Sequence, residues 1–278
     1  MLSPDEAFAA LRAAPCGARA LGVLARHPGA WIVGGAVRDA LLGRPVGELD
    51  VVVEGDPEPV AQALGEVVAF HERFRTYDVV APDGCVIDVV MARAERYEAP
   101  GALPDVRASG LEDDLLRRDF TVNALALSGT GELAAAPAAL DDLEAGRLRV
   151  LHAASFRDDP TRLWRLVRYA VRLGFAPEPA TDRLAFEAVR RGALATVSGD
   201  RLGAELRLAL GEPHPLAALH AAQNLGLVDG LILDPAFVAQ ALALLPPHEA
   251  RADLTLLGAV IPDGASLTPG SFTRPETE

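Results

Sequence analysis

The stretch that decides the fold is Trp31–Glu54, which reads WIVGGAVRDALLGRPVGELDVVVE. Its first three residues form an apolar run that is typical of the end of a buried strand. Gly34 and Gly35 follow, where the backbone can turn tightly and approach a ligand closely because no Cβ stands in the way. Residues 36–42 have helical composition, and residues 48–53 are β-rich. The stretch therefore predicts a strand, a glycine turn, a helix and a second strand.

The second predicted strand carries two carboxylates, Glu48 and Asp50, at positions i and i+2. In a strand this spacing puts both on one face, with Leu49 pointing to the other. The free N–H groups where a glycine turn enters a helix favour an anion such as phosphate, and carboxylates are ligands that Mg²⁺ prefers. Each piece alone also fits a plain turn or a solvated strand edge. Together they predict a site for metal and phosphate.

Composition places the chain among globular proteins. Its 278 residues are enough for two domains, and half of them are hydrophobic. All 26 basic residues are arginine and the net charge is −13, which argues against a nucleic-acid partner for the chain as a whole. Residues 147–207, however, hold 12 arginines against 7 acids, whereas the remaining residues hold 14 against 32. This asymmetry predicts a confined basic surface, as a local polyanion site would need.

The cysteine spacing and the N-terminal sequence indicate in which cellular compartment the protein is expected. Cys16 and Cys85 lie far apart in the sequence, so we expect no disulfide framework and no zinc site. The chain shows no signal-peptide pattern, and no apolar run approaches membrane-spanning length. We therefore expect a cytoplasmic protein that does not enter a membrane.

The rest of the first half predicts alternating helices and strands. Ser3 and Glu6 form a capping-box pattern at the start of the first helix. Asp88 interrupts an apolar strand; it is either on an exposed strand face or a third metal carboxylate, and both interpretations stay open. The expected segments are helices at about 4–12, 18–26 and 56–64, a hairpin of strands 77–81 and 85–91, a loop over 93–110 and a helix over 111–127.

The order GGAVRD and then LDVVV resembles the head domain of nucleotidyltransferases in the DNA polymerase beta superfamily. It is most similar to the class II bacterial tRNA nucleotidyltransferases and poly(A) polymerases. Residues 117–124, RRDFTVNA, match the family's RRDFTxNA motif. We expect Asp119 and Asn123, at i and i+4, to share a helix face. The resemblance implies that Arg118, Asp119 and Asn123 contact the nucleotide's ribose and phosphates.

The same resemblance implies roles in the first motif. Glu48 and Asp50 would hold Mg²⁺, with Asp88 as a possible third catalytic carboxylate. Gly34, Gly35 and Arg38 would hold the triphosphate. The family usually has Asp in the first metal position, so Glu48, one methylene longer, departs from the pattern.

A later stretch, Asp158–Arg162 (DDPTR), begins a predicted helix and resembles the family's EDxxR motif. A carboxylate that accepts from an exocyclic amino group and a guanidinium that donates to a ring nitrogen suit cytosine and adenine, but not guanine and uracil. Asp159 and Arg162 are the candidates for reading the base, with Asp158 beside them. Arg162, Arg165, Arg168 and Arg172 recur at helical spacing, which fits either a solvated face or, for the last three, RNA phosphate contacts.

The resemblance covers about residues 30–210 and implies an α+β fold: a nucleotidyltransferase head with a small mixed sheet, then an all-helical neck and a shortened body. We expect N-terminal helices over 1–29, the head over 30–145, the neck over 146–212 and a short body with a frayed tail over 213–278. The implied reaction adds CCA, from CTP and ATP, to the tRNA 3′ acceptor end. A CC-adding or A-adding enzyme, a poly(A) polymerase and a non-catalytic RNA- or nucleotide-binding relative remain alternatives. The sequence leaves the oligomeric state open.

Overall fold

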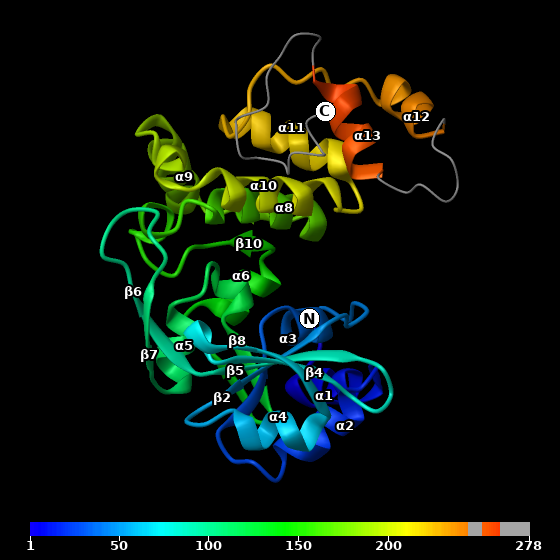
Figure 1. Cartoon of the computed structure of the whole chain (residues 1–278), viewed down its shortest axis with the longest axis vertical. Helices are drawn as coiled ribbons and strands as arrows, with labels where there is room; N and C mark the ends of the chain where they lie inside the picture. Colours follow the sequence, from blue (N-terminus) through cyan, green and yellow to red (C-terminus); the bar gives the residue numbers. More distant parts are fainter. Residues whose placement is uncertain (244–251, 262–278) are drawn as a thin grey trace. The chain divides into compact units, whose positions relative to one another are not determined.

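The computed structural model describes residues 1–243 and 252–261, which fall into two compact units. Unit 1 holds Met1–Arg96 and Pro104–Leu151, and unit 2 holds Tyr97–Leu103 and His152–Glu278. The sheet lies in unit 1, and unit 2 is mainly helical (Figure 1). The predicted α+β class, a mixed sheet followed by helices, is thus confirmed. The finer division of the helical part into neck and body stays a prediction.

Unit 1 is organised around a seven-stranded sheet with the order β3-β4-β5-β2-β1-β8-β9. Its strands are β1 (Ala30–Val33), β2 (Leu49–Val53), β3 (Glu66–His71), β4 (Thr76–Val80), β5 (Val86–Met91), β8 (Leu125–Ser128) and β9 (Leu133–Ala135). The β2–β5 pair is parallel, and the other neighbouring pairs are antiparallel. The sheet is therefore mixed, and the parallel pair lies near its middle.

Helices cover the sheet and close the core of unit 1. They are α1 (Pro4–Ala13), α2 (Gly17–Leu24), α3 (Gly35–Leu41), α4 (Glu58–Leu64), α5 (Leu111–Leu116) and α6 (Ala139–Glu144). Figure 1 shows α1, α2 and α4 together on one side of the sheet. Leu111 and Leu115 of α5 join a buried cluster with Val33 and Val52 of the sheet. The predicted capping box is confirmed, because the Ser3 and Glu6 side chains each accept from the other's backbone N–H.

Two predictions of local structure are wrong. The helix expected over 111–127 ends at Leu116, and a 3₁₀ turn, η2 (Thr121–Asn123), and strand β8 follow. β8 pairs with β1, so long-range sheet pairing overrides a helical composition. The loop expected over 93–110 contains two short paired strands, β6 (Arg93–Arg96) and β7 (Asp105–Ala108). Their charged side chains hide the apolar alternation by which a strand is recognised.

The expectation that the cysteines do not pair is also wrong. Cys16 and Cys85 form a disulfide across a sequence separation of 69, with Cα atoms 6.3 Å apart. Cys16 caps the start of α2, and Cys85 ends the turn between β4 and β5. The fold brings these two points together, and sequence spacing alone cannot show this.

Unit 2 consists mainly of helices. They are α7 (Ser155–Asp158), α8 (Arg162–Leu173), α9 (Pro179–Arg190), the 3₁₀ turn η3 (Ala193–Thr196), α10 (Gly199–Leu210), α11 (Pro215–Leu225), α12 (Pro235–Ala243) and α13 (Ala252–Val260). Two very short strands, β10 (Arg147–Leu148) in unit 1 and β11 (Ala176–Pro177) in unit 2, complete the elements. The tail expected to be frayed lies, after Ile261, outside the described residues.

The described ranges contain no single helix with the length and hydropathy of a membrane span. Only α1 and α2 taken together, across a bend of 118°, reach that length and composition.

Candidate active site

A row of carboxylates crosses three neighbouring strands of unit 1. In register, Asp50 of β2 lies opposite Asp88 of β5, and Asp88 lies opposite Asp78 of β4. Residues opposite one another in a sheet point to the same face, so these three acids share one face. Asp50 and Asp88 are exposed, as is Glu48, which stands one residue before β2. The predicted catalytic carboxylates are therefore brought together, and Asp78, which the sequence analysis did not single out, extends the row.

The negative charges of neighbouring carboxylates affect the pKa of Asp88. Partial burial raises the pKa of Asp88, and the charges of Asp78 and Glu48 raise this pKa further, against a smaller opposite effect from His71. His71 in turn lies 3.1 Å from Asp78 through its Nε2. A cluster of like charges is stabilised by a cation, so the row would favour a bound metal ion.

The donors in this row are the hard oxygen ligands that Mg²⁺ prefers. The carboxylate oxygens of Glu48, Asp50 and Asp88 are not gathered as tightly as a preformed cage. Among the described residues, the close group of potential ligand side chains is Cys16, Asp83 and Cys85, and its two sulfurs form the disulfide and so cannot bind a metal as thiolates. Mg²⁺ commonly binds through one or two carboxylates plus substrate phosphates and waters, so an open row still suits it.

The glycine turn lies directly beside the carboxylate row. Val33, the residue before Gly34, pairs with Asp50 in the sheet. Gly34 has φ +69 and ψ −128, a conformation that glycine adopts far more readily than other residues, and it caps α3. A Cβ at Gly34 would stand 3.0 Å from Arg118 Nη1, whereas one at Gly35 would meet the Arg38 guanidinium at an ordinary 3.6 Å. The turn therefore brings backbone, acids and Arg118 close together.

A chain of buried polar side chains fixes the other side of this turn. Arg38 Nη1 donates to Asn123 Oδ1 at 2.6 Å, and its Nε and Nη2 donate to the two oxygens of Asp39. Asn123 Nδ2 donates to Asp119 Oδ1 at 3.0 Å. Asp119 and Asn123 thus lie in contact, as expected. They do not share a helix face, however: Phe120 is extended, and the 3₁₀ turn that follows brings Asn123 to Asp119. These hydrogen bonds hold each side chain in one orientation.

Asp114 holds the two arginines of the RRD motif. It is fully buried, and it accepts from Arg117 Nη2 at 2.7 Å and Arg118 Nη2 at 2.8 Å. Burial raises the pKa of Asp114, but Arg118 and Arg117 outweigh this and hold the pKa below its ordinary value. Arg118 Nε is buried and finds no hydrogen-bond acceptor within the described part of the chain. The Arg118 side chain is thus held at one end by Asp114.

In unit 2, Asp159 is fixed from several sides. Its Oδ1 accepts from Thr161 Oγ1 at 2.7 Å, from the Thr161 backbone N–H and from Arg201 Nη2 at 2.8 Å. Arg201 Nη1 also donates to the Gly101 carbonyl at 2.7 Å. Within the described ranges no hydrogen bond reaches Asp159 Oδ2, so this oxygen can accept from a ligand. Arg201 therefore helps to hold the Asp159 carboxylate in place.

Arg162 and Asp158 lie on either side of Asp159. Arg162 is buried, begins α8 and donates from Nη1 to Ser155 Oγ at 2.7 Å. Burial lowers the pKa of His152, and the charge of Arg162 lowers it further, which keeps the imidazole neutral beside the guanidinium. Asp158 accepts from the neighbouring Arg157. The predicted base-reading pair is therefore built into a packed turn.

The arginine row of α8 is less open than its spacing suggests. Arg168 is buried and donates to Glu212 at 2.9 Å and Glu205 at 2.8 Å. Arg172 donates through Nε to Glu212 at 2.7 Å. Arg165 is half-buried and lies over the Tyr169 ring at 5.8 Å. Their role as RNA contacts stays a prediction, but Arg168 and Arg172 already have carboxylate partners, and the sequence analysis did not foresee Glu212.

Comparison with known proteins shows which families and enzymes this chain resembles. The poly A polymerase head domain matches residues 30–149. An A-adding tRNA nucleotidyltransferase of Geobacter sulfurreducens is 45% identical over 206 residues, which are 71% of this chain and 23% of the relative. A CC-adding tRNA nucleotidyltransferase of Deinococcus radiodurans is 40% identical over 247 residues, which are 85% of this chain and 65% of the relative.

Solved structures show the same likeness. The apo form II of a CCA-adding enzyme has 34% sequence identity and a TM-score of 0.71, covering 87% of this chain and 59% of that one. The Thermotoga maritima CCA-adding enzyme complexed with tRNA has 31% identity and a TM-score of 0.63, covering 81% of this chain and 55% of that one. The chain thus spans from about a quarter to about two thirds of the length of these relatives.

Proposed function

Because the chain belongs to the tRNA nucleotidyltransferase and poly(A) polymerase family, we propose that it transfers nucleotides to the 3′ end of tRNA. The observation that carries the proposal is the register of the sheet, which sets Asp50 opposite Asp88 and beside the residue that precedes Gly34. This arrangement places oxygen donors for a cation next to a turn that accepts an anion. A nucleoside triphosphate with its cation needs both.

Each residue then has a defined task in the reaction. Glu48 and Asp50, with Asp88 beside them, would hold Mg²⁺, which in such transfers stabilises the attacking and leaving oxygens of an in-line displacement. The tRNA 3′-OH attacks the α-phosphorus of the nucleotide, a new phosphodiester forms, and pyrophosphate leaves. Gly34 and Gly35 let the triphosphate approach the backbone closely.

The nucleotide-side residues act by position and charge. Arg38 and Arg118 offer positive charge to the phosphates. Burial of Arg38 and the ion pair of the half-buried Arg118 with Asp114 keep each guanidinium in one place. Asp119 and Asn123 face the ribose. Since their side chains are already hydrogen-bonded to one another, little ordering is left for the moment of binding.

Base selection falls to Asp159 and Arg162. The Oδ2 atom of Asp159 accepts from the exocyclic amino group that cytosine and adenine share, and the Arg162 guanidinium donates to the adjacent ring nitrogen. Guanine and uracil present a carbonyl in place of the amino group, and the mismatch would leave buried polar groups unpaired. The proposed substrates are therefore CTP and ATP.

Full CCA addition is the activity that we propose, in a cytoplasmic enzyme. A partial activity, CC addition or A addition alone, is the second candidate, because the relatives named above carry those two names. The deciding experiment gives the protein three tRNA transcripts: one that lacks the whole CCA end, one that lacks only the terminal A, and one that is complete. Labelled CTP and ATP are supplied separately and together.

Growth of the first transcript by CCA supports the full activity. Growth of the first transcript by CC alone supports a CC-adding enzyme. Growth of the second transcript by A, with no growth of the first, supports an A-adding enzyme, and a long tail from ATP supports poly(A) synthesis. Incorporation into none of them, with Mg²⁺ present, would contradict the proposed function.

A further inference from the structure

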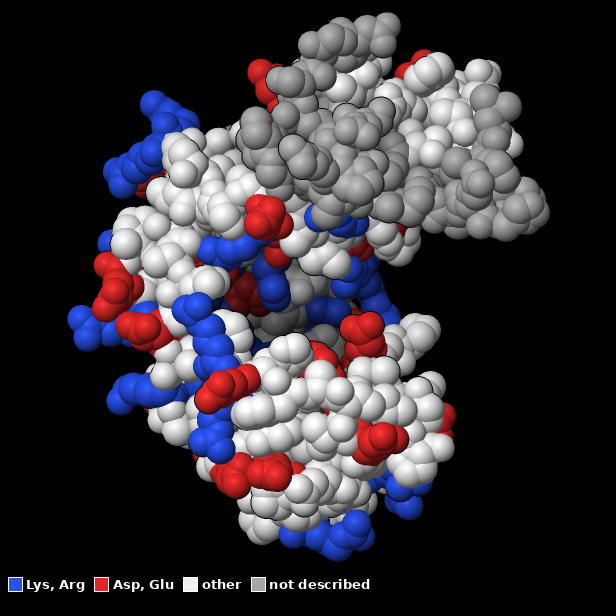
Figure 2. Space-filling model, viewed as in Figure 1, with Lys and Arg blue, Asp and Glu red and all other residues white. Residues whose placement is uncertain are grey.

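The outer face of α9 carries a cluster that the active site does not use. Its members recur at i, i+3, i+4, i+7 and i+8, so they lie along one side of the helix. They are Arg183, Phe186, Glu187, Arg190 and Arg191. All five are exposed, whereas Thr181 and Ala185 on the opposite side are buried. Figure 2 shows blue arginine side chains standing out over α9.

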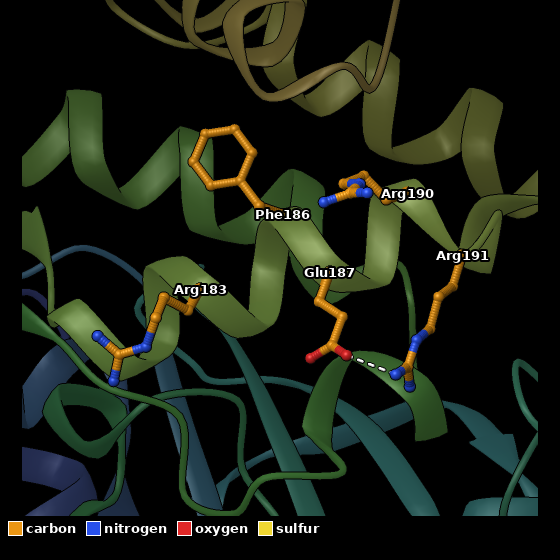
Figure 3. A pocket seen from close by; sticks show the side chains of 5 residues that line it. All are labelled: Arg183, Phe186, Glu187, Arg190 and Arg191. Atoms are coloured by element: carbon orange, nitrogen blue, oxygen red, sulfur yellow. Dashed lines mark ion pairs between the residues drawn. The ribbon is translucent and has the colours of Figure 1, made fainter.

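The charges of this face are only partly neutralised. Glu187 forms an ion pair with Arg191 at 2.5 Å, drawn as the dashed line in Figure 3. Arg183 and Arg190 form no ion pair with any other described residue. The face therefore carries a net charge of about +2 in a chain whose net charge is −13. Such a local excess of positive charge favours a polyanion.

An aromatic ring stands between these two arginines. Phe186 is 46% exposed, although the burial of a large apolar side chain normally stabilises a fold. A hollow of about 510 Å³ lies over the face, and the described residues that line it are the five named above (Figure 3). Arginines that neutralise phosphates, together with an exposed ring on which a base can stack, are the features of a single-strand nucleic-acid surface.

We propose that this face of α9 is an RNA-docking surface, where Arg183 and Arg190 bind phosphates and Phe186 stacks on an unpaired base of the tRNA substrate. The proposal rests on the proposed function only for the identity of the RNA. The arginines are seven residues apart, about 10.5 Å along the helix axis. They are therefore far enough apart to bind different phosphates of one RNA strand. In this proposal Arg183 and Arg190 bind the RNA phosphates that the sequence analysis assigned to Arg168 and Arg172, whose side chains bind Glu212.

The test measures the affinity of the full-length protein for a tRNA transcript that lacks its CCA end, by filter binding over a series of salt concentrations. The double variant Arg183→Gln/Arg190→Gln removes two phosphate contacts, so the slope of log Kd against log salt should fall by roughly 1.4–1.8. The matched control Arg12→Gln/Arg26→Gln removes two exposed arginines of unit 1 and should keep the wild-type slope. Equal slopes for the α9 double variant and wild type would overturn the proposal.

A second variant tests the ring. Phe186→Ala should weaken binding about fivefold or more at every salt concentration with an unchanged slope, because stacking releases no counterions. Phe186→Trp should restore the affinity, and an unchanged affinity in Phe186→Ala would overturn the stacking role. Melting temperatures of all these variants should equal that of wild type.

Kinetics separate this inference from the proposed function. At saturating tRNA the α9 double variant should keep the wild-type rate of nucleotide addition, and only its KM for tRNA should rise. If wild type adds no nucleotide, the proposed function fails, while the binding series still tests the surface. If wild type is active and the α9 variants bind tRNA normally, the docking surface alone is wrong.

Discussion

The buried carboxylate of Glu212 should be a main source of stability in unit 2. Its side chain is 1% exposed and accepts from Arg168 Nε at 2.9 Å and from Arg172 Nε at 2.7 Å. Removal of one partner from a buried ion pair leaves the opposite charge uncompensated, which costs about 3–5 kcal/mol. We therefore expect Glu212→Ala to lower the free energy of unfolding of unit 2 by about 3 kcal/mol, the lower end of this range, because Arg168 would keep Glu205 and Arg172 is partly exposed.

A matched control lies in the same unit. Glu187 pairs with Arg191 at 2.5 Å, yet these two side chains are 51% and 76% exposed. Exposed ion pairs contribute only about 0–1 kcal/mol, so Glu187→Ala should change the free energy of unfolding little. Because both ion pairs are short, a difference between the two variants in the free energy of unfolding reports the effect of burial.

The chain supplies a reporter for unit 2. Trp31 lies in unit 1 and Trp164, which is buried in α8, lies in unit 2. In a Trp31→Phe background, urea unfolding followed by fluorescence reports on Trp164 alone, and the midpoint and slope give the free energy. A loss below about 1 kcal/mol for Glu212→Ala, equal to that of Glu187→Ala, would refute the reasoning.

The pH dependence gives an independent check. Burial raises the pKa of Glu212, but hydrogen bonds from Arg172 and Arg168 outweigh this and hold the pKa below its ordinary value. A carboxylate with a lowered folded pKa contributes stability above its unfolded pKa, and this contribution is lost as the pH falls through the folded value. The difference between wild type and Glu212→Ala should be constant near neutral pH and shrink below roughly pH 4.3. A difference that grows on acidification would contradict the assignment.

Three further outcomes are expected. Asp50→Asn should abolish nucleotide addition without a change in melting temperature, because Asp50 is exposed and is proposed to bind the metal; near-normal turnover would show that this assignment is wrong. Gly34→Ala should lower the free energy of unfolding in urea by about 1–3 kcal/mol, because a Cβ at this backbone conformation is strained and stands 3.0 Å from Arg118. The control Gly22→Ala should not lower it, because a Cβ there meets nothing within 4 Å. Cys85→Ser should lower the free energy of unfolding by about 2–4 kcal/mol, because the disulfide to Cys16 is lost. With a reducing agent, the urea unfolding curve of wild type should coincide with that of the variant. An unfolding curve of wild type that does not change on reduction would refute the contribution of the disulfide.

The sequence predicted those parts of the site that depend on local pattern. Strand alternation put Glu48 and Asp50 on one face, and the glycine pair predicted the turn beside them; both concern neighbours in the chain. The partners across the sheet follow from strand order, and the parallel pairing that sets Asp88 opposite Asp50 cannot be read from spacing. Asp78 was missed for the same reason.

The failures share one physical cause, which is contact between distant segments. Residues 125–127 have helical composition but complete the sheet beside β1. The α8 arginines have the spacing of a solvated stripe, but Glu212, 44 residues from Arg168, occupies that side. The disulfide joins residues 69 apart. Local preferences of a few tenths of a kcal/mol per residue give way to such contacts.

The placement of Tyr97–Leu103 within unit 2 has a consequence for dissection of the chain. Because this segment is inserted between two stretches of unit 1, the polypeptide passes between the units three times. Gly101 fits there with φ +71, where a Cβ would collide with the Thr196 backbone at 2.7 Å, and its carbonyl accepts from Arg201. A fragment that starts at His152 would lack the segment Tyr97–Leu103, and Arg201 would lose the Gly101 carbonyl as an acceptor. The two units are therefore not separable modules that recombination could exchange with a single cut, and a swap would have to carry both pieces of each unit.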